Sequence, residues 1–188
     1  MINTSERTHF LEGESIYLIP IEEHHIDEYY EKLSSGSFNS YKYTGSKVII
    51  TKVGVKNFIS KICSDNSRVD FFIVNKESNE IVGEVVINDI DWQNRSANIR
   101  IAIFQEQNYN KEYGTDALLV ALNFGFGMYN LHRIELQVYS FNKRAIHVYE
   151  KIGFKREGIL RDCLYFDNKY YDAIVMSILH TEFKIDNE

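Results

Sequence analysis

The fold of this chain is decided by one stretch: Ser140-Phe141-Asn142-Lys143-Arg144-Ala145-Ile146-His147-Val148-Tyr149-Glu150-Lys151-Ile152-Gly153-Phe154. Asn142 is a favourable N-cap residue, and Gly153 is a favourable left-handed stop after a last helical turn. Ala145, Ile146, Tyr149 and Ile152 recur between them at helical spacing. The stretch therefore predicts the end of a strand, a short capped helix and a stop. Asn142 and Tyr149 are about two turns apart, so we expect both side chains near one face, roughly 10 Å apart along the helix axis.

The run from Asn142 to Phe154 resembles motif B of the GCN5-related N-acetyltransferases. It is most similar to the branch that contains the ribosomal-protein N-terminal acetyltransferases and the spermidine acetyltransferases. The resemblance extends from about Ile16 to Phe183, and residues 165–172 look like the closing hairpin of the same branch. It implies an acetyltransferase fold that uses acetyl-CoA. The alternative interpretation is an ordinary amphipathic helix whose tyrosine is part of the core.

Length and composition favour one globular domain over residues 1–188, with a core at about 12–183. Hydrophobic residues make up 44% of the chain and charged residues 26%, which is usual for a folded domain. The formal net charge of -6 and the lack of a lysine-rich run argue against a nucleic-acid partner. Cys63 and Cys163 are isolated, so neither a metal site nor a disulfide framework is expected, and a cytoplasmic location fits. Neither a membrane-spanning run nor a secretory signal is apparent.

Hydrophobic periodicity predicts strands at 12–20, 69–74, 81–90, 97–103, 133–139, 154–165 and 170–179, and helices at 21–33, 53–63 and 117–129 and after Asn142. Residues 34–47 are rich in Ser, Gly, Asn and Tyr and are predicted to form a loop. Its aromatic residues Phe38, Tyr41 and Tyr43 are unusual for an idle connection. The order of elements predicts a mixed α/β (α+β) fold, in which a central, mostly antiparallel twisted sheet carries helices on both faces.

The resemblance places the coenzyme pyrophosphate on backbone N–H groups where a loop opens a helix, because the helix dipole favours anions there. The family pattern Gln/Arg-x-x-Gly-x-Gly/Ala falls on residues 109–114, and only Gly114 matches. Glu112 occupies the first glycine position, where its charge repels a phosphate by about 1 kcal/mol. Lys111 and Lys143 could offset that charge. An ordinary polar loop without a ligand is the alternative interpretation.

The residues expected at the coenzyme are Asn110, Lys111, Glu112, Tyr113, Gly114, Thr115, Asn142, Lys143 and Tyr149, together with the backbone of Ile101, Ala102 and Ile103 beside the acetyl carbonyl. Tyr149 matches the family tyrosine that protonates the departing coenzyme thiolate, and a phenol is neutral at pH 7. Asn142 matches the family asparagine that contacts the pantetheine arm. These roles are what the resemblance implies.

The general base is not evident from the residues. The strand position at which relatives often carry a carboxylate is Asn98 here, and an amide cannot take up a proton. Glu84, Asp89 and Asp91 lie on or after the neighbouring strand and could act through water, although each could equally be a solvated or turn carboxylate. Catalysis could instead draw on the neutral fraction of the amine.

Acceptor recognition is expected from Tyr41 in the aromatic segment and from Asp89, Trp92 and Asn98, because carboxylates beside aromatic rings suit a cation. The acceptor would be a small cationic amine or a protein N-terminal amine. The resemblance also implies a homodimer. The competing hypothesis is a binding module of the same fold, without catalysis, whose coenzyme loop has decayed.

Overall fold

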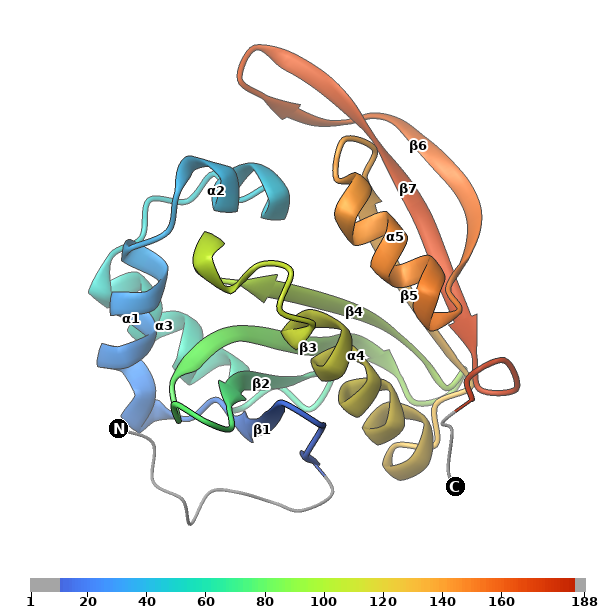
Figure 1. Ribbon diagram of the computed structural model, residues 1–188, viewed down its shortest axis with the longest axis horizontal. Helices are drawn as coiled ribbons and strands as arrows, with labels where there is room; N and C mark the ends of the chain where they lie inside the picture. The colour runs from blue at the N-terminus through green and yellow to red at the C-terminus, as the bar shows by residue number, and fades with distance from the viewer. Residues whose placement is uncertain (1–10, 185–188) are drawn as a thin grey trace.

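The computed structural model describes residues 11–184, in which a single sheet has the strand order β1-β2-β3-β4-β5-β7-β6 (Figure 1). The strands are β1 (Ile16–Pro20), β2 (Val69–Asn75), β3 (Ile81–Asp91), β4 (Ser96–Ile103), β5 (Arg133–Tyr139), β6 (Lys155–Phe166) and β7 (Lys169–Leu179). All neighbours pair antiparallel except β4 and β5, which are parallel. The predicted mixed, mostly antiparallel sheet is confirmed. The expectations about the N-terminal signal and the outer limits of the domain fall outside the described residues.

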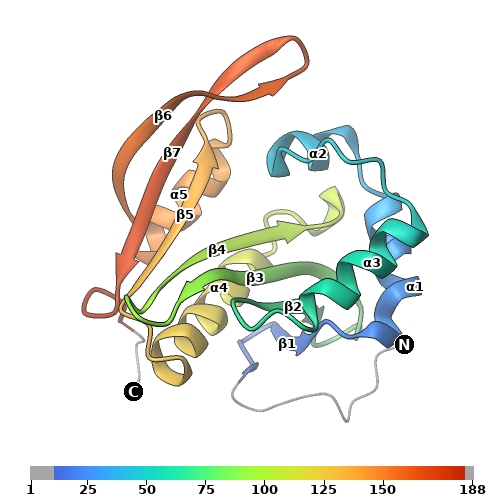
Figure 2. The ribbon, with the colours of Figure 1, turned by 180° about the vertical axis from the view of Figure 1, so that it is seen from behind.

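Helices cover both faces of the sheet, as predicted (Figures 1 and 2). They are the 3₁₀ helix η3 (Glu23–His25), α1 (Ile26–Ser34), α2 (Phe38–Thr44), α3 (Lys52–Ile62), the 3₁₀ helix η4 (Glu106–Asn108), α4 (Tyr113–Asn123), the π-helix η5 (Phe124–Met128) and α5 (Lys143–Ile152). One core cluster joins the sheet to α4 and α5, through residues such as Leu118, Leu122 and Ile146. The other joins it to α1 and α3, through residues such as Tyr29 and Ile59.

The loop predicted for residues 34–47 is wrong, because its middle forms helix α2. Ser37 is the N-cap, and its hydroxyl oxygen accepts a hydrogen bond from the Ser40 N–H. Gly45 ends the helix with φ of 68°, a left-handed conformation that glycine adopts without steric cost. Two turns are too short to show helical periodicity. The helix buries none of its residues, and one of its contacts is with a distant residue, between the rings of Phe38 and Phe166.

The predicted helix at 117–129 begins earlier and ends differently. Helix α4 begins at Tyr113, so the loop before it meets the helix one turn sooner than the apolar pattern indicates. Its last turns widen into η5, where the Tyr129 N–H donates to the Phe124 carbonyl. Gly125 allows this turn to approach the sheet closely, since a methyl group there would lie 2.9 Å from Ile134 Cδ1.

The sheet opens between β4 and β5. These strands pair over three residues each, Ser96–Asn98 beside Arg133–Glu135. Beyond this ladder β4 stays paired with β3 as far as Ile103, whereas β5 follows β7 as far as Tyr139, so the two strands diverge (Figure 1). We call residues 99–103 the open edge of β4, because the neighbouring strand has left them. Their backbone groups on that side have no ladder partner in β5.

Candidate active site

Helix α5 forms where the sequence predicts it. The Asn142 side-chain oxygen accepts a hydrogen bond of 3.2 Å from the Ala145 N–H, which confirms the predicted N-cap. Gly153 adopts φ of 113° at the other end, and its N–H donates to the carbonyls of Tyr149 and Glu150. No described residue accepts a hydrogen bond from the Asn142 side-chain NH₂ group. That donor therefore remains for a ligand beside the first turn of α5.

The Tyr149 side chain is buried, but no described residue forms a hydrogen bond with its hydroxyl. The side chain is 8% exposed and its ring lies 5.8 Å from that of Phe154. Within residues 11–184, no group hydrogen-bonds to its hydroxyl. In the same residues, Asn88 Oδ1 is the one fully buried side-chain nitrogen or oxygen atom without a partner, so the Tyr149 oxygen is not fully buried. The Tyr149 oxygen therefore retains access to solvent. Burial raises the pKa of Tyr149 to about 12, so the phenol is a proton donor at neutral pH.

The loop before α4 has a left-handed backbone at two residues, one of which is Glu112 at the predicted glycine position. Asn110 and Glu112 adopt φ of 59° and 60°, the left-handed region that favours glycine. Glu112 is the N-cap and makes no side-chain capping hydrogen bond. The first N–H groups of a helix have no intrahelical partner, so the first turn of α4 presents the donors that an anion needs. Backbone and helix thus fit a pyrophosphate group.

Helix α5 touches this loop near both of its ends. The Arg144 guanidinium carbon lies 3.9 Å from the centroid of the Tyr109 ring. Lys151 Nζ lies 3.6 Å from Glu112 Oε2. The charge of Glu112 is therefore paired with Lys151, which the sequence did not single out, and no ion pair joins it to Lys111 or Lys143 among the described residues. Both contacts hold the loop alongside the helix that carries Tyr149.

The open edge of β4 lies directly under the start of α4. A methyl group at Gly114 would lie 3.8 Å from Ile101 Cδ1 and 4.0 Å from Ile103 Cγ1, which is ordinary van der Waals contact. The Tyr113 side chain turns away, because its hydroxyl accepts a hydrogen bond from the Asn75 amide. The structure thus brings together the loop at 110–115, the open edge and α5, which are the segments that carry the predicted coenzyme residues.

The predicted acceptor residues are not all brought to this place. Tyr41 lies on α2, and Asn98 is the last residue of β4 paired with β5, where the strands begin to diverge. Asp89 and Trp92 lie beside the turn between β3 and β4, at the opposite end of β4 from Ile103. The structure therefore separates Asp89 and Trp92 from the open edge.

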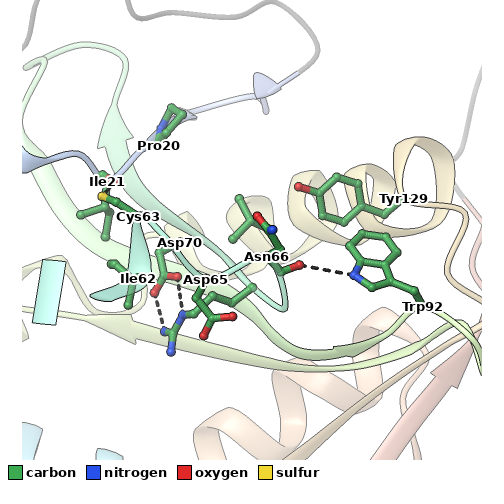
Figure 3. A pocket seen from close by; sticks show the side chains of 11 residues that line it. Pro20, Ile21, Ile62, Cys63, Asp65, Asn66, Asp70, Trp92 and Tyr129 are labelled. Carbon is green, nitrogen blue, oxygen red and sulfur yellow. Dashed lines mark hydrogen bonds and ion pairs between the residues drawn. The ribbon is translucent and has the colours of Figure 1, made fainter. Parts of the chain in front are cut away.

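Trp92 instead borders a hollow of about 530 Å³ (Figure 3). Its indole N–H donates to the Asn66 carbonyl, and its ring lies 5.2 Å from that of Tyr129. Arg68 reaches the same hollow, but both of its hydrogen bonds of 2.7 Å go to the Asp70 carboxylate. The hollow lies at the turn end of the strands, so we assign it no part in the chemistry at the open edge.

A cluster of rings closes the space between α2 and the far ends of β5 and β7. Its members are Tyr43, Tyr139, Phe141 and Tyr171, and we call them the ring cluster. Lys42 Nζ lies 4.8 Å from the Phe141 ring centroid and 5.4 Å from that of Tyr171. The chain's own ammonium group thus already makes cation–π contacts there. The sequence singled out Tyr43 as an unusual aromatic residue, but the rings that it joins come from distant segments, so the sequence did not predict the cluster.

Residues 15–155 match a family model described as an acetyltransferase (GNAT) domain, and the chain therefore belongs to this family of acetyl-CoA-dependent enzymes. The spermidine N(1)-acetyltransferase of Vibrio cholerae is 30% identical over 129 residues, which are 69% of this chain and 73% of that protein. The uncharacterized N-acetyltransferase YokL of Bacillus subtilis is 31% identical over 116 residues, which are 62% of this chain and 65% of YokL, slightly less than two thirds of its length.

A solved structure of the V. cholerae spermidine N-acetyltransferase, in complex with CoA and spermine, matches the fold with a TM-score of 0.82. The match is 24% identical and covers 89% of this chain and 97% of the other. The predicted fold, the N-acetyltransferase class and the coenzyme are thus confirmed at the level of the family. Within residues 11–184, no helix is long and apolar enough to cross a membrane.

Proposed function

We propose that this chain transfers the acetyl group of acetyl-CoA to a primary amine, by direct attack of the amine on the thioester. One observation carries the proposal: Tyr149, whose hydroxyl has no hydrogen-bond partner among residues 11–184, lies on a helix that contacts the loop before α4 at Tyr109 and Glu112. When bound, acetyl-CoA supplies the activated acyl group. The chain's own residues then have to hold the coenzyme, polarise the carbonyl and move two protons.

Each of those tasks has a candidate in the structure. The first turn of α4 offers N–H groups to the pyrophosphate, and the free NH₂ group of Asn142 is a donor for the pantetheine arm. Backbone N–H groups of the open edge would polarise the acetyl carbonyl. Tyr149 would give its proton to the sulfur as the bond from carbon to sulfur breaks. Because the pKa of Tyr149 is about 12, its hydroxyl stays protonated across the pH range in which amines become neutral.

The acceptor that we propose is a small cationic amine or a protein N-terminal amine. The contact of Lys42 with Phe141 and Tyr171 supports an ammonium-bearing acceptor, since these rings already receive an ammonium group. The relative from V. cholerae acts on spermidine, which is an amine of this kind. Tyr41 and Asn98 remain proposed acceptor contacts, whereas the positions of Asp89 and Trp92 offer no support for theirs.

The competing proposal is a binding module of the same fold without catalysis. Two observations favour it: Glu112 adds a negative charge where a phosphate should sit, and Asn98 cannot act as a base. Titration calorimetry with acetyl-CoA separates the two proposals. Binding in the micromolar range, followed by release of free thiol when amines are added, supports the enzyme. Absence of binding at millimolar acetyl-CoA, or binding without thiol release across a panel of amines, would support the module.

Replacing Tyr149 with Phe tests the proposed acid. The variant lacks the hydroxyl but keeps the ring that packs against Phe154, so the fold should be retained. We expect kcat to fall about 100-fold or more, as removal of a general acid does, with CoA affinity within twofold of the wild type. Val148→Ala, one position earlier on the same helix, is the matched control. An unchanged kcat in Tyr149→Phe would remove this residue from the mechanism.

The homodimer implied by the resemblance is proposed at the outer edge of β6. No strand of the described part of the chain pairs with the outer side of β6, and Ile159 and Leu160 on it are 64% and 40% exposed. A second copy paired antiparallel about Ile159 would place Arg156 opposite Asp162. Light scattering should report a dimer that Ile159→Lys converts to a monomer, while Met128→Lys, equally exposed on η5, leaves it intact. A dimer that survives Ile159→Lys rejects this edge.

We also propose that the protein acts in the cytoplasm. Cys63 and Cys163 are both free and exposed, and a reducing compartment would keep such thiols unpaired. Fractionation of the source cells, followed by immunodetection, tests this location directly.

A further inference from the structure

We propose that Glu84, oriented by Tyr29, accepts the proton that the acceptor amine loses, on the face of the sheet opposite Tyr149. The Tyr29 hydroxyl on α1 donates a hydrogen bond to Glu84 Oε2 on β3. The inference rests on the proposed function and adds the general base that the sequence does not identify.

Glu84 lies one strand away from the open edge. It is paired with Ala102 of β4, and adjacent strands lie about 4.8 Å apart. Its other cross-strand neighbour, Phe72, belongs to the core beneath α1 and α3, so the Glu84 side chain is on that face. The residue is partly exposed. The proposal requires a bridging water between its carboxylate, which burial partly encloses, and an amine at the edge of β4.

The acid and the base would lie on opposite faces of the sheet. Tyr149 belongs to the core cluster beneath α4 and α5, whereas Tyr29 belongs to the cluster beneath α1 and α3. The ladder between β4 and β5 ends at Asn98, so past that residue the backbone of β5 does not separate the two faces. An acetyl group at the open edge would meet a proton donor on one side and a proton acceptor on the other.

The electrostatic setting of Glu84 suits a base. Burial raises the pKa of the Glu84 carboxyl above its ordinary range, whereas the hydrogen bond from Tyr29 and the charge of Arg100 lower it. Asp70 raises it and Arg68 lowers it, and these two residues form an ion pair with each other. A carboxylate whose pKa is raised toward neutrality takes up protons more readily than a surface carboxylate. Burial and the charge of Glu84 also raise the pKa of Tyr29, which therefore remains a hydrogen-bond donor.

The other carboxylates considered for this role are engaged or distant. Asp91 accepts hydrogen bonds from the N–H groups of Gln93 and Asn94 in its turn, and the bonds from Asn94 are the main cause of its lowered pKa. Asp89 lies at the same end of the sheet, away from the open edge. Among the three candidates, Glu84 is thus the one that pairs with the open edge of β4.

Glu84 and Tyr149 together account for every proton that the reaction moves. The acceptor ammonium gives one proton through water to Glu84 and becomes a nucleophile. The bond between nitrogen and carbon forms, the bond between carbon and sulfur breaks, and the sulfur keeps the electron pair. Tyr149 protonates the sulfur, and a second proton from the nitrogen restores the phenol. Glu84 then releases its proton to solvent, so the products are the amide, free CoA and one proton.

Glu84→Gln is the decisive variant, because glutamine keeps an acceptor for the Tyr29 hydroxyl and cannot take up a proton. We expect kcat to fall about 100-fold or more, with CoA affinity unchanged, and the acid limb of the kcat–pH profile to disappear. Asp89→Asn is the matched control and should behave as the wild type. Tyr29→Phe removes a hydrogen bond that lowers the pKa of Glu84, so the acid limb should move to higher pH. A merely structural pair would move neither limb.

A second readout needs no coenzyme. Because the folded protein raises the pKa of Glu84, the wild type should lose stability relative to Glu84→Gln as the pH rises from about 4.3 toward the folded value. Denaturant midpoints measured at several pH values report this difference. The proposal is overturned if Glu84→Gln keeps the wild-type kcat and acid limb. If Tyr149→Phe is slow in that case, only the base is wrong, whereas failure of the wild type to bind acetyl-CoA would reject the proposed function itself.

Discussion

Replacing Glu112 with Gly should tighten CoA binding and stabilise the fold. Glu112 holds a left-handed conformation, which costs a residue with a Cβ about 1–2 kcal/mol. Glycine removes this cost but gives the unfolded chain more freedom, worth about 0.5–1 kcal/mol, so the expected net gain is roughly 0.5–1 kcal/mol. Loss of the carboxylate also removes a repulsion of about 1 kcal/mol from the pyrophosphate, which corresponds to roughly a fivefold lower Kd. The Lys151 ammonium, now paired with Glu112, becomes free to face the phosphates.

Glu112→Gln separates the two effects, because it removes the charge and keeps the Cβ. Calorimetry with CoA should show the affinity gain in both variants, whereas chemical denaturation should show the stability gain only in Glu112→Gly. The affinity gain should shrink between about 50 mM and 500 mM salt, since salt screens charges at this exposed site. If neither variant binds CoA more tightly at low salt, the pyrophosphate does not lie at the first turn of α4, and the placement of the coenzyme is wrong.

Three further predictions concern the scaffold. Asn142→Ala removes the cap bond to the Ala145 N–H and should lower the free energy of unfolding by about 1 kcal/mol, while Asn142→Asp should recover it, both measured by urea denaturation. The hydrogen bond from Arg133 lowers the pKa of Glu157 to about 2. The ionised Glu157 carboxylate therefore stabilises the fold above about pH 4.3, and this stabilisation is lost as the pH falls toward 2. The urea midpoint of Glu157→Gln should differ from that of the wild type at about pH 7 but not at about pH 2. Gly45→Ala places a Cβ at φ of 68° and should lower the melting temperature, unlike Gly36→Ala, whose φ is not positive.

The sequence was most informative where local rules and the fold agree. Alternating apolar residues predicted β4, and the cap at Asn142 with the stop at Gly153 predicted α5, because each pattern is complete within the element itself. Helix α2 was missed for the opposite reason. Its two turns bury no residue and so carry no apolar periodicity, and its ring contact between Phe38 and Phe166 joins distant segments, which a local pattern does not contain.

In the candidate site too, the sequence predicted residues within a local motif and missed contacts between distant residues. Tyr149 was found because a motif surrounds it. The pairing of Lys151 with Glu112 joins residues far apart in the chain, so no local pattern revealed it. The hydrogen bond between Tyr29 and Glu84 likewise joins α1 to β3, and only the antiparallel register of β2 with β3 turns the Glu84 side chain toward α1.

The left-handed backbone at Asn110 and Glu112 bears directly on whether the coenzyme loop has decayed. A backbone of this kind leaves N–H groups open to an anion, but it is not specific to phosphate-binding loops, since seven other residues with a Cβ among those described also have positive φ. The departures from the family pattern are Tyr109 and Glu112, of which only Glu112 adds a charge, and Lys151 lies 3.6 Å from that charge. An exposed pair of this kind contributes little to stability, which leaves Lys151 able to exchange its partner for a phosphate. The choice between enzyme and binding module therefore depends on whether the charge of Glu112 prevents phosphate binding at the first turn of α4, which the Glu112 variants measure.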